Sequence, residues 1–234
     1  MNKETVKKIL GETESGYDLI SKKFSQTRKR FWGGLEFIKD YSKKGDRILD
    51  YGCGNGRLLE LFCNTGNDYV GMDVSGKLIE FAKKQYAVCD RIGFLKLNPH
   101  QTSLSFPDNY FNSVYSIAVF HHIPSEELRL EIARELFRVT AKNGHIIITA
   151  WNLWQPKYRK NIFKNRVRKI FGMSDLDWSD CYISFTDNEG QKFNRFHHAF
   201  TVRDMKNLFE HAGFETEKCE VVEGRNVVFV GKKL

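Results

Sequence analysis

The sequence predicts an α/β fold of the Rossmann-like, doubly wound type, with a seven-stranded and mostly parallel sheet. Short apolar segments alternate with helix-like segments between residues 47 and 151, as expected for parallel strands joined by crossover helices. The first apolar segment leads into a glycine-rich turn, Asp50-Tyr-Gly52-Cys-Gly54-Asn-Gly56. The last two apolar segments flank Glu223-Gly224-Arg225 and predict a terminal antiparallel hairpin. A basic helical insertion separates these two parts.

The length of 234 residues is enough for one large α/β domain with a full core. We therefore expect a single domain over 1–234, with an N-terminal helical cap at 1–45 and an insertion or lid at 152–194. No apolar run reaches the length that crosses a bilayer, and the charged N-terminus lacks the apolar centre of a signal peptide. We expect a cytoplasmic protein without a membrane partner.

The cysteines and the net charge limit the function classes. The five cysteines form no Cys-x-x-Cys pair and no Cys/His group at zinc spacing, so we expect free thiols and no metal. A formal net charge of +8 permits a polyanionic partner, provided that the positive charges are clustered.

Five segments before the insertion predict parallel strands: 47–52, 68–75, 91–97, 113–120 and 145–151. Helix-like segments follow the first two strands at 57–64 and 77–87. A third helix is predicted to begin at Ser125, with Glu126 and Glu127 favoured by the helix dipole in its first turn, and to end at Asn143-Gly144.

The alternation breaks at 152–194, where no strong strand signal occurs. Within this segment, 156–171 carries seven Lys or Arg residues between Lys157 and Lys169 and no acidic residue. Ile162, Phe163, Val167, Ile170 and Phe171 recur at helical spacing, so one face is expected to pack while the other presents cations. An RNA backbone is the partner we favour for that face, and a solvated surface or an anionic membrane is the alternative.

Regular structure returns at Thr201. Asp204 three residues later predicts a capping box, and the helix is expected to run through His211 and to end at Gly213. The final strands are predicted at 214–222 and 226–233.

The glycine-rich turn lies where a strand gives way to a helix, so a ligand can approach the backbone closely. Asp73, at the end of the next strand, is placed to accept hydrogen bonds from ribose hydroxyls. Asp50 would repel a pyrophosphate and instead suits a ligand with an ammonium group and no phosphate, such as S-adenosylmethionine. The alternative is that the glycines only make a tight turn. The expected cofactor site here comprises Asp50, Gly52, Cys53, Gly54, Asp73 and Val74.

The segments ILDYGCGNGRLL, YVGMDVS and SIAVFHHI resemble the class I S-adenosylmethionine-dependent methyltransferases over most of residues 47–150. The resemblance implies further cofactor contacts from Ile117 and His122. His100 stands where these enzymes often place an adenine-binding acid, so His100 and the Gln101 backbone are the expected adenine contacts, with Asn98 as an alternative.

The segment 17–32 together with SIAVFHHI, TAWNLWQ and NRFHHAF gives a closer resemblance. These four segments resemble the eukaryotic tRNA methyltransferases that esterify a carboxymethyl group on a wobble uridine. The family resemblance implies tRNA as substrate and a small activator protein as partner. Phe196 and His197 replace two tyrosines of the family, Trp154 replaces an acidic residue, and Ile183-Ser184-Phe185 stands in place of a Val-Pro-Trp segment. The matching residues are Tyr17, Phe24, Thr27, Arg28 and Trp32; Ser116, Ile117, Ala118, Val119, His121 and His122; Trp151 and Gln155; and Arg195, His198 and Phe200.

Because a carboxylate is already ionised at neutral pH, methyl transfer to it requires positioning and no strong base. Arg195 is expected to hold the carboxylate through two hydrogen bonds, with His198 as a further donor. Tyr17 and Arg28 are expected at the cofactor. Two alternatives stay open for the function: a methyltransferase for a small carboxylate or quinone-like acceptor, and a non-catalytic module that binds cofactor or RNA.

The sequence contains Phe-His-His twice, at 120–122 and at 196–198. Successive side chains of an extended segment point to opposite sides, so one histidine of each pair is expected to face the site. His122 is expected to line the cofactor pocket, and His121, a candidate catalytic residue, to face the lid or the core. A zinc site built from four histidines is the alternative.

Overall fold

The computed structural model describes residues 1–28, 30–62, 65–87, 91–186 and 189–234. Cys63 and Cys89 lie outside the described residues, whereas Cys53, Cys181 and Cys219 are free thiols, as predicted. None of the described helices combines the length and the apolar composition that crossing a bilayer requires.

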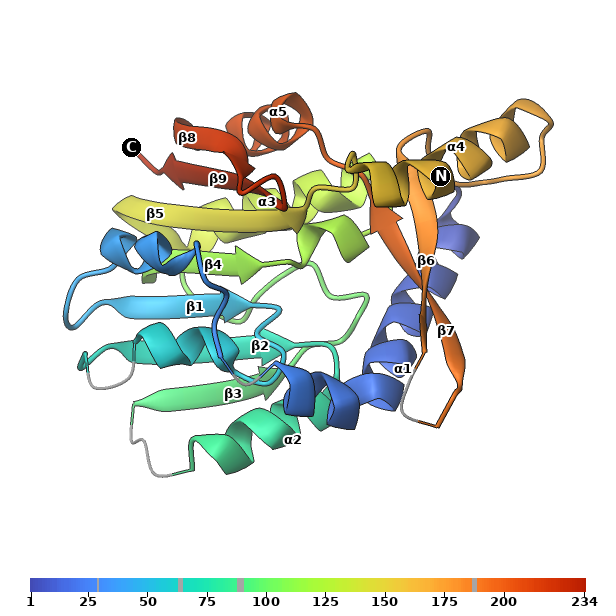
Figure 1. The fold of residues 1–234 in the computed structure, drawn as a ribbon. Helices are drawn as coiled ribbons and strands as arrows, with labels where there is room; N and C mark the ends of the chain where they lie inside the picture. The colour runs from blue at the N-terminus through green and yellow to red at the C-terminus, as the bar shows by residue number, and fades with distance from the viewer. Residues whose placement is uncertain (29, 63–64, 88–90, 187–188) are drawn as a thin grey trace.

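A seven-stranded sheet with the order β3-β2-β1-β4-β5-β9-β8 forms the centre of the protein (Figure 1). The first five strands pair in parallel, whereas β9 is antiparallel to both β5 and β8. The predicted doubly wound fold with a terminal hairpin is confirmed. The strands are β1 (Arg47–Tyr51), β2 (Asp68–Asp73), β3 (Ile92–Lys96), β4 (Phe111–Ile117), β5 (Thr140–Trp151), β8 (Glu215–Val222) and β9 (Asn226–Lys232).

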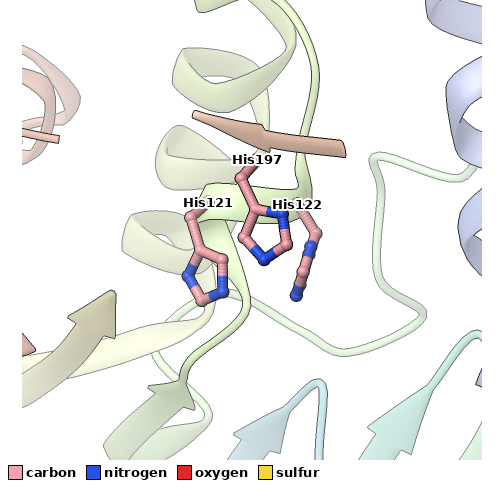
Figure 2. Close-up of side chains that lie close together, drawn as sticks. All are labelled: His121, His122 and His197. Atoms are coloured by element: carbon pink, nitrogen blue, oxygen red, sulfur yellow. The ribbon is translucent and has the colours of Figure 1, made fainter. Parts of the chain in front are cut away.

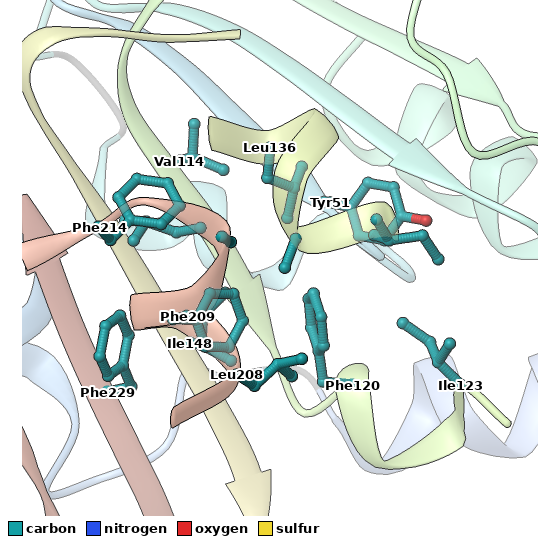
Figure 3. Close-up of a cluster of buried hydrophobic side chains, with 14 of the residues drawn as sticks. Tyr51, Val114, Phe120, Ile123, Leu136, Ile148, Leu208, Phe209, Phe214 and Phe229 are labelled. Atoms are coloured by element: carbon teal, nitrogen blue, oxygen red, sulfur yellow. The ribbon is translucent and has the colours of Figure 1, made fainter. Parts of the chain in front are cut away.

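Helices cover both faces of the sheet and bury its apolar side chains. On one face, α3 (Glu126–Val139) and α5 (Val202–Ala212) pack Leu136 and Phe209 against the strands (Figure 3). On the other face, α2 (Gly76–Gln85) and the short 3-10 helices η1 (Glu36–Tyr41) and η2 (Arg57–Leu61) bury Ile38, Leu58 and Ile79. These two cores fix the strand ends, where the ligand cavity lies.

The capping box predicted for α5 is confirmed. The Thr201 side chain accepts a hydrogen bond from the Asp204 backbone N–H, and the Asp204 side chain accepts one from the Thr201 backbone N–H. Gly213 then ends the helix with a φ of 114°, a backbone conformation that favours glycine.

The predicted end of the third helix at Asn143-Gly144 is wrong, because α3 ends at Val139 and β5 already begins at Thr140. The reason is pairing with the sheet. Thr140 pairs with Phe111, and the Asn143 backbone N–H donates to the carbonyl of Lys233 at 2.7 Å. Strand hydrogen bonds from distant segments thus outweigh the local helix-stop signal.

The segment 152–194, which shows no strong strand signal in the sequence, and the residues just after it contribute two strands that were not predicted. Strands β6 (Asp180–Thr186) and β7 (Lys192–His198) form an antiparallel hairpin outside the main sheet. Figure 1 shows this hairpin beside the long N-terminal helix α1 (Lys3–Thr27). Contact with α1 is close at Gly16, where an added Cβ would lie 1.8 Å from the Phe193 ring. Packing against a segment far away in the sequence therefore stabilises the hairpin.

Helix α4 (Pro156–Ile170) forms as predicted but packs differently. Of the five apolar residues expected on its packing face, Ile162 is buried, whereas Phe163, Ile170 and Phe171 are 65%, 69% and 72% exposed. Val167 is also exposed. The helix projects from the body of the protein, so both its cationic and its apolar side chains face solvent (Figure 1).

Candidate functional site

A deep cavity opens at the carboxyl ends of the parallel strands. Its walls include Tyr51 at the end of β1, Asp73 at the end of β2, Ile117 at the end of β4 and Trp151 at the end of β5. Helix α1 closes one side with Tyr17, Phe24 and Arg28, and β7 contributes Arg195. Ligands of open α/β sheets bind at this edge, which makes the cavity the candidate site.

The glycine-rich turn brings bare backbone against the cavity. Gly52, Gly54 and Gly56 all have φ between 56° and 82°, a region that L side chains rarely adopt. A Cβ on Gly52 would lie 2.2 Å from Cγ2 of Val119. The Gly54 N–H donates to Oδ2 of Asp73 at 2.8 Å, and the Ser75 N–H donates to Oδ1 of Asp73. These backbone donors fix the orientation of the Asp73 carboxylate in the cavity wall.

Two buried carboxyl groups lie under the turn. Burial raises the pKa of Asp50 to about 7, although a hydrogen bond from the Tyr69 hydroxyl at 2.5 Å partly offsets this effect. Burial likewise raises the pKa of Asp73 to about 6, against the lowering effect of the Ser75 and Gly54 N–H groups. A cationic or hydroxyl-bearing ligand would favour the ionised forms.

Aromatic and guanidinium groups line the α1 side. The Arg28 guanidinium lies over the Phe24 ring, with its carbon 4.6 Å from the centroid, and that of Arg57 lies 3.5 Å over the Trp32 ring. Burial lowers the pKa of Arg28, and the nearby Arg195 guanidinium acts in the same direction. Two arginines close together favour an anionic group, such as a ligand carboxylate, between them.

Arg195 enters the cavity from β7 and is 5% exposed. Its guanidinium carbon lies 5.3 Å from the centroid of Trp151 and 5.0 Å from that of Phe185. The buried Nε has no hydrogen-bond partner among the described residues. Stacking fixes the plane of the guanidinium while leaving this donor available to a ligand.

The two Phe-His-His copies converge on one cluster, which consists of His121, His122 and His197 (Figure 2). The prediction that only one histidine of the first pair faces the site is wrong, because His121 and His122 lie in the 3-10 turn η3 (Phe120–His122) and not in an extended strand. Both rings line the cavity, with centroids 4.2 Å apart. The turn therefore places both on the same side.

Burial sets the charge of this cluster. It lowers the pKa of His122 to about 3, with the Arg195 guanidinium as a second cause. Burial also holds the pKa values of His121 and His197 well below the usual range, again helped by neighbouring imidazoles and Arg195. The three imidazoles are consequently neutral at physiological pH.

Three predicted site residues do not reach the cavity. His198 is buried, its Nδ1 lies 2.7 Å from Oδ1 of Asp180, and its ring packs against Phe200. The β7 pleat turns His198 away from Arg195's side, so it cannot donate to a ligand there. His100 lies at a shallow surface hollow, and the Gln101 backbone N–H donates to the Asn98 carbonyl.

Leu97 and Pro99 occupy the cavity wall where His100 and Gln101 were expected. Apolar contacts of this kind suit the face of an adenine ring. The other predicted cofactor residues all line the cavity: Tyr17, Arg28, Asp50, Gly52, Cys53, Gly54, Asp73, Val74, Ile117 and His122. Asn55, Arg57 and Leu58 also line it and were not predicted; their position just after the glycines was the available signal.

Comparison with known proteins identifies the relatives of this fold and site. The family described as a methyltransferase domain matches residues 23–218. A tRNA (carboxymethyluridine(34)-5-O)-methyltransferase of Arabidopsis thaliana is 33% identical over 135 residues, 58% of this chain and 31% of that protein. The chain thus spans about a third of the length of this relative. The Schizosaccharomyces pombe protein of the same name is 27% identical over 84% of this chain and 86% of its own length.

Solved structures share the fold. A SAM-dependent methyltransferase of Methanosarcina mazei aligns with a TM-score of 0.70 and 22% identity over 88% of this chain and 99% of its own. A Haloferax volcanii complex of the Trm112 methyltransferase activator with a methyltransferase aligns with a TM-score of 0.62 and 16% identity, over 94% of this chain and 96% of that chain. Family and fold indicate S-adenosylmethionine as the cofactor, which confirms the prediction.

Proposed function

The chain belongs to the methyltransferase-domain family, and on that premise we propose that its methyl acceptor is tRNA, at the carboxymethyl group of a wobble uridine, which it converts to the methyl ester. Relatives with this activity in their names support the acceptor class. The observation that carries the proposal within the structure is Arg195, a buried guanidinium in the cavity wall that is fixed between two aromatic rings.

The cofactor would lie along the glycine-rich turn. Asp73 would accept hydrogen bonds from the ribose hydroxyls, Asp50 would attract the ammonium group, and Arg28 with Tyr17 would hold the carboxylate. S-adenosylmethionine, when bound, supplies a methyl group on a positively charged sulfur. Gly52 and Gly54 lie in the cavity wall with bare backbone, which lets such a ligand approach the main chain closely.

Arg195 would hold the acceptor carboxylate and orient one of its oxygens toward the cofactor side of the cavity. Because that oxygen is already ionised, it would accept the methyl group without transfer of a proton. The neutral histidines are consistent with a reaction that needs no general base. Trp151, in the cavity wall, would contribute an aromatic contact for an unstacked base.

Helix α4 supports an RNA substrate. Lys157, Lys160 and Lys164 are exposed, and none forms an ion pair within the described residues. Phosphates are suitable partners for such a row of free cations. A small activator protein of the Trm112 type and a cytoplasmic location complete the proposal; the solved complex with a related fold supports the first.

The test is methyl transfer from labelled S-adenosylmethionine to tRNA that carries carboxymethyluridine, with and without a Trm112-type activator, followed by nucleoside mass spectrometry. We expect a methyl-ester uridine with the wild type, and loss of at least 100-fold in rate for Arg195→Ala with cofactor binding retained. Arg134→Ala, on the exposed face of α3, is the matched control. Equal rates for Arg195→Ala and wild type, or activity on small carboxylates alone, would contradict the proposal.

A further inference from the structure

We propose that His121, His122 and His197 bind a divalent transition-metal ion, with zinc as the natural candidate, and leave a fourth coordination position open toward the cavity. One nitrogen of each ring lies within 4.8 Å of the others. Tetrahedral zinc with three imidazoles needs nitrogens roughly 3.3 Å apart, given Zn–N distances of about 2.0–2.1 Å. Metal binding therefore requires the rings to rotate until these nitrogens come closer by up to roughly 1.5 Å.

The hydrogen bonds of two rings expose their ligating nitrogens. His122 Nδ1 lies 2.8 Å from the carbonyl oxygen of Phe196, and His197 Nδ1 lies 3.0 Å from that of Arg195. A carbonyl oxygen only accepts, so both Nδ1 atoms carry the proton and both Nε2 atoms present a lone pair. Metal-binding histidines are oriented in the same way, through a hydrogen bond from the second nitrogen to a backbone carbonyl.

The remaining nitrogens lack partners. His121 and His197 are fully buried, and neither nitrogen of His121 nor Nε2 of His197 has a hydrogen-bond partner among the described residues. Buried polar atoms without partners are rare in proteins and call for an ion or water. The His197 Nε2 lone pair has no donor among the described residues, and that of His122 Nε2 meets the Tyr17 hydroxyl, so a cation that displaces this hydroxyl would satisfy both acceptors together with His121.

Aromatic packing supports the cluster. The His121 ring lies 5.6 Å from Trp151 and 5.2 Å from His197 between centroids, and Trp151 and His197 lie 5.5 Å from each other. The Tyr17 hydroxyl lies 2.7 Å from Nε2 of His122 and must move aside when that nitrogen binds a metal. Three imidazole ligands with an open fourth position are typical of catalytic rather than structural zinc sites.

One charge opposes a bare cation. The Arg195 guanidinium is close enough to lower the pKa of all three histidines. A metal here is therefore expected together with an anionic fourth ligand, such as hydroxide or chloride. If the proposed function holds, the acceptor carboxylate can take that position, held by the metal and Arg195 together. Metal binding itself does not depend on the proposed function.

The experiment measures metal binding by untagged protein, in buffer with chloride and without tRNA. Metal analysis and competition titration with Zn²⁺ should give one site per chain, and Co²⁺ should produce an absorption spectrum of nitrogen ligation without a thiolate charge-transfer band. His121→Asn and His197→Asn should each weaken Zn²⁺ binding at least ~100-fold. This effect exceeds the one expected when only a hydrogen bond to a metal-binding histidine is lost. His211→Asn, on the exposed face of α5, should bind like wild type.

Circular dichroism and cofactor titration establish that each variant is folded. Wild-type protein gives a second readout that needs no variant, because Zn²⁺ should raise its melting temperature relative to chelator. Absence of a one-to-one site in wild type, a thiolate band with Co²⁺, or equal affinity for wild type and His121→Asn would each overturn the proposal. Methylation that survives complete metal removal would leave the site intact but remove its role in the reaction.

Discussion

The Tyr17 hydroxyl lies 2.7 Å from Nε2 of His122, a contact between residues 105 positions apart. The opposite nitrogen of the same imidazole meets the carbonyl oxygen of Phe196. One ring thus connects α1, the η3 turn and β7, three segments that close the cavity from different sides. The Tyr17 ring also packs edge-on against His122, at 5.5 Å between centroids.

Tyr17→Phe removes this connection while keeping the ring. We expect the free energy of unfolding to fall by about 1–3 kcal/mol, because the buried Nε2 of His122 loses its donor. Cofactor affinity should fall as well, since α1 forms one wall of the cavity. Chemical denaturation and calorimetric titration measure the two effects. Tyr110→Phe, whose hydroxyl has no hydrogen bond among the described residues, should change neither.

Asp50→Asn should separate stability from binding. The pKa of Asp50 in the folded protein, about 7, exceeds its ordinary 3.8, so the folded state binds the proton more tightly than the unfolded state. Tighter proton binding by the folded state stabilises the protein in acid, and this contribution to the free energy of unfolding is lost as pH rises from about 4 to about 7. At pH 8 the variant without cofactor should therefore be more stable by about 1–3 kcal/mol, after the cost of an imperfectly paired amide.

The same substitution should weaken cofactor binding, because a neutral amide does not attract an ammonium group. Denaturation at pH 8 and at pH 5 provides the check on stability. The gain should largely disappear at pH 5, where Asp50 is already protonated. A variant that is less stable than wild type at pH 8 would show that burial of the ionised Asp50 carboxylate does not destabilise the fold.

Cofactor affinity should depend on pH between about 5 and 8. Binding favours ionised Asp50 and Asp73, whose pKa values are raised to about 7 and about 6. Affinity should thus fall by up to roughly tenfold per pH unit below 7, more steeply below 6, and level off above 8. Titrations in buffers of different ionisation enthalpy should detect proton release at pH 6.5. A flat profile would mean that both groups are ionised before the ligand arrives.

Much of the fold was predictable because its determinants are local. Alternating strands and helices, the Thr201 capping box and the turn at Glu223-Gly224-Arg225 are encoded within a few residues. The predictions fail where hydrogen bonds or packing with distant segments determine the secondary structure. Thr140 joins β5 because it pairs with Phe111, Asn143 continues the strand because it bonds Lys233, and β7 forms beside α1. No local pattern contains that information.

The site shows the same division. Asp50, Gly52 and Asp73 follow from a turn and a strand end, and all line the cavity. His198 was misplaced because its partner, Asp180, belongs to a strand that the sequence did not predict. The histidine cluster could not be found by spacing, since His197 comes from a segment remote from His121 and His122 and the first pair lies in a 3-10 turn.

Helix α4 predicts a salt-dependent contact with RNA. The slope of log affinity against log salt concentration is negative, and replacing Lys160 and Lys164 by Gln should reduce its magnitude by roughly 1.4–1.8, the value for two lost phosphate contacts. Lys83→Gln with Lys84→Gln, on the exposed face of α2, is a control of equal charge change. Filter binding with tRNA between low and moderate salt measures the slope. Equal slopes for the two double variants would place the RNA elsewhere.

Gly52→Ala tests whether the glycine-rich turn is needed for its backbone shape. The φ of +82° disfavours a side chain by about 1–2 kcal/mol, and the new Cβ would lie 2.2 Å from Cγ2 of Val119, a clash worth about 1–3 kcal/mol. We expect lower stability and loss of cofactor binding. Gly93→Ala, with nothing within 4 Å of its Cβ, should be neutral. Adding Val119→Ala to Gly52→Ala should recover only the part of the loss due to the clash, since the backbone strain at residue 52 persists.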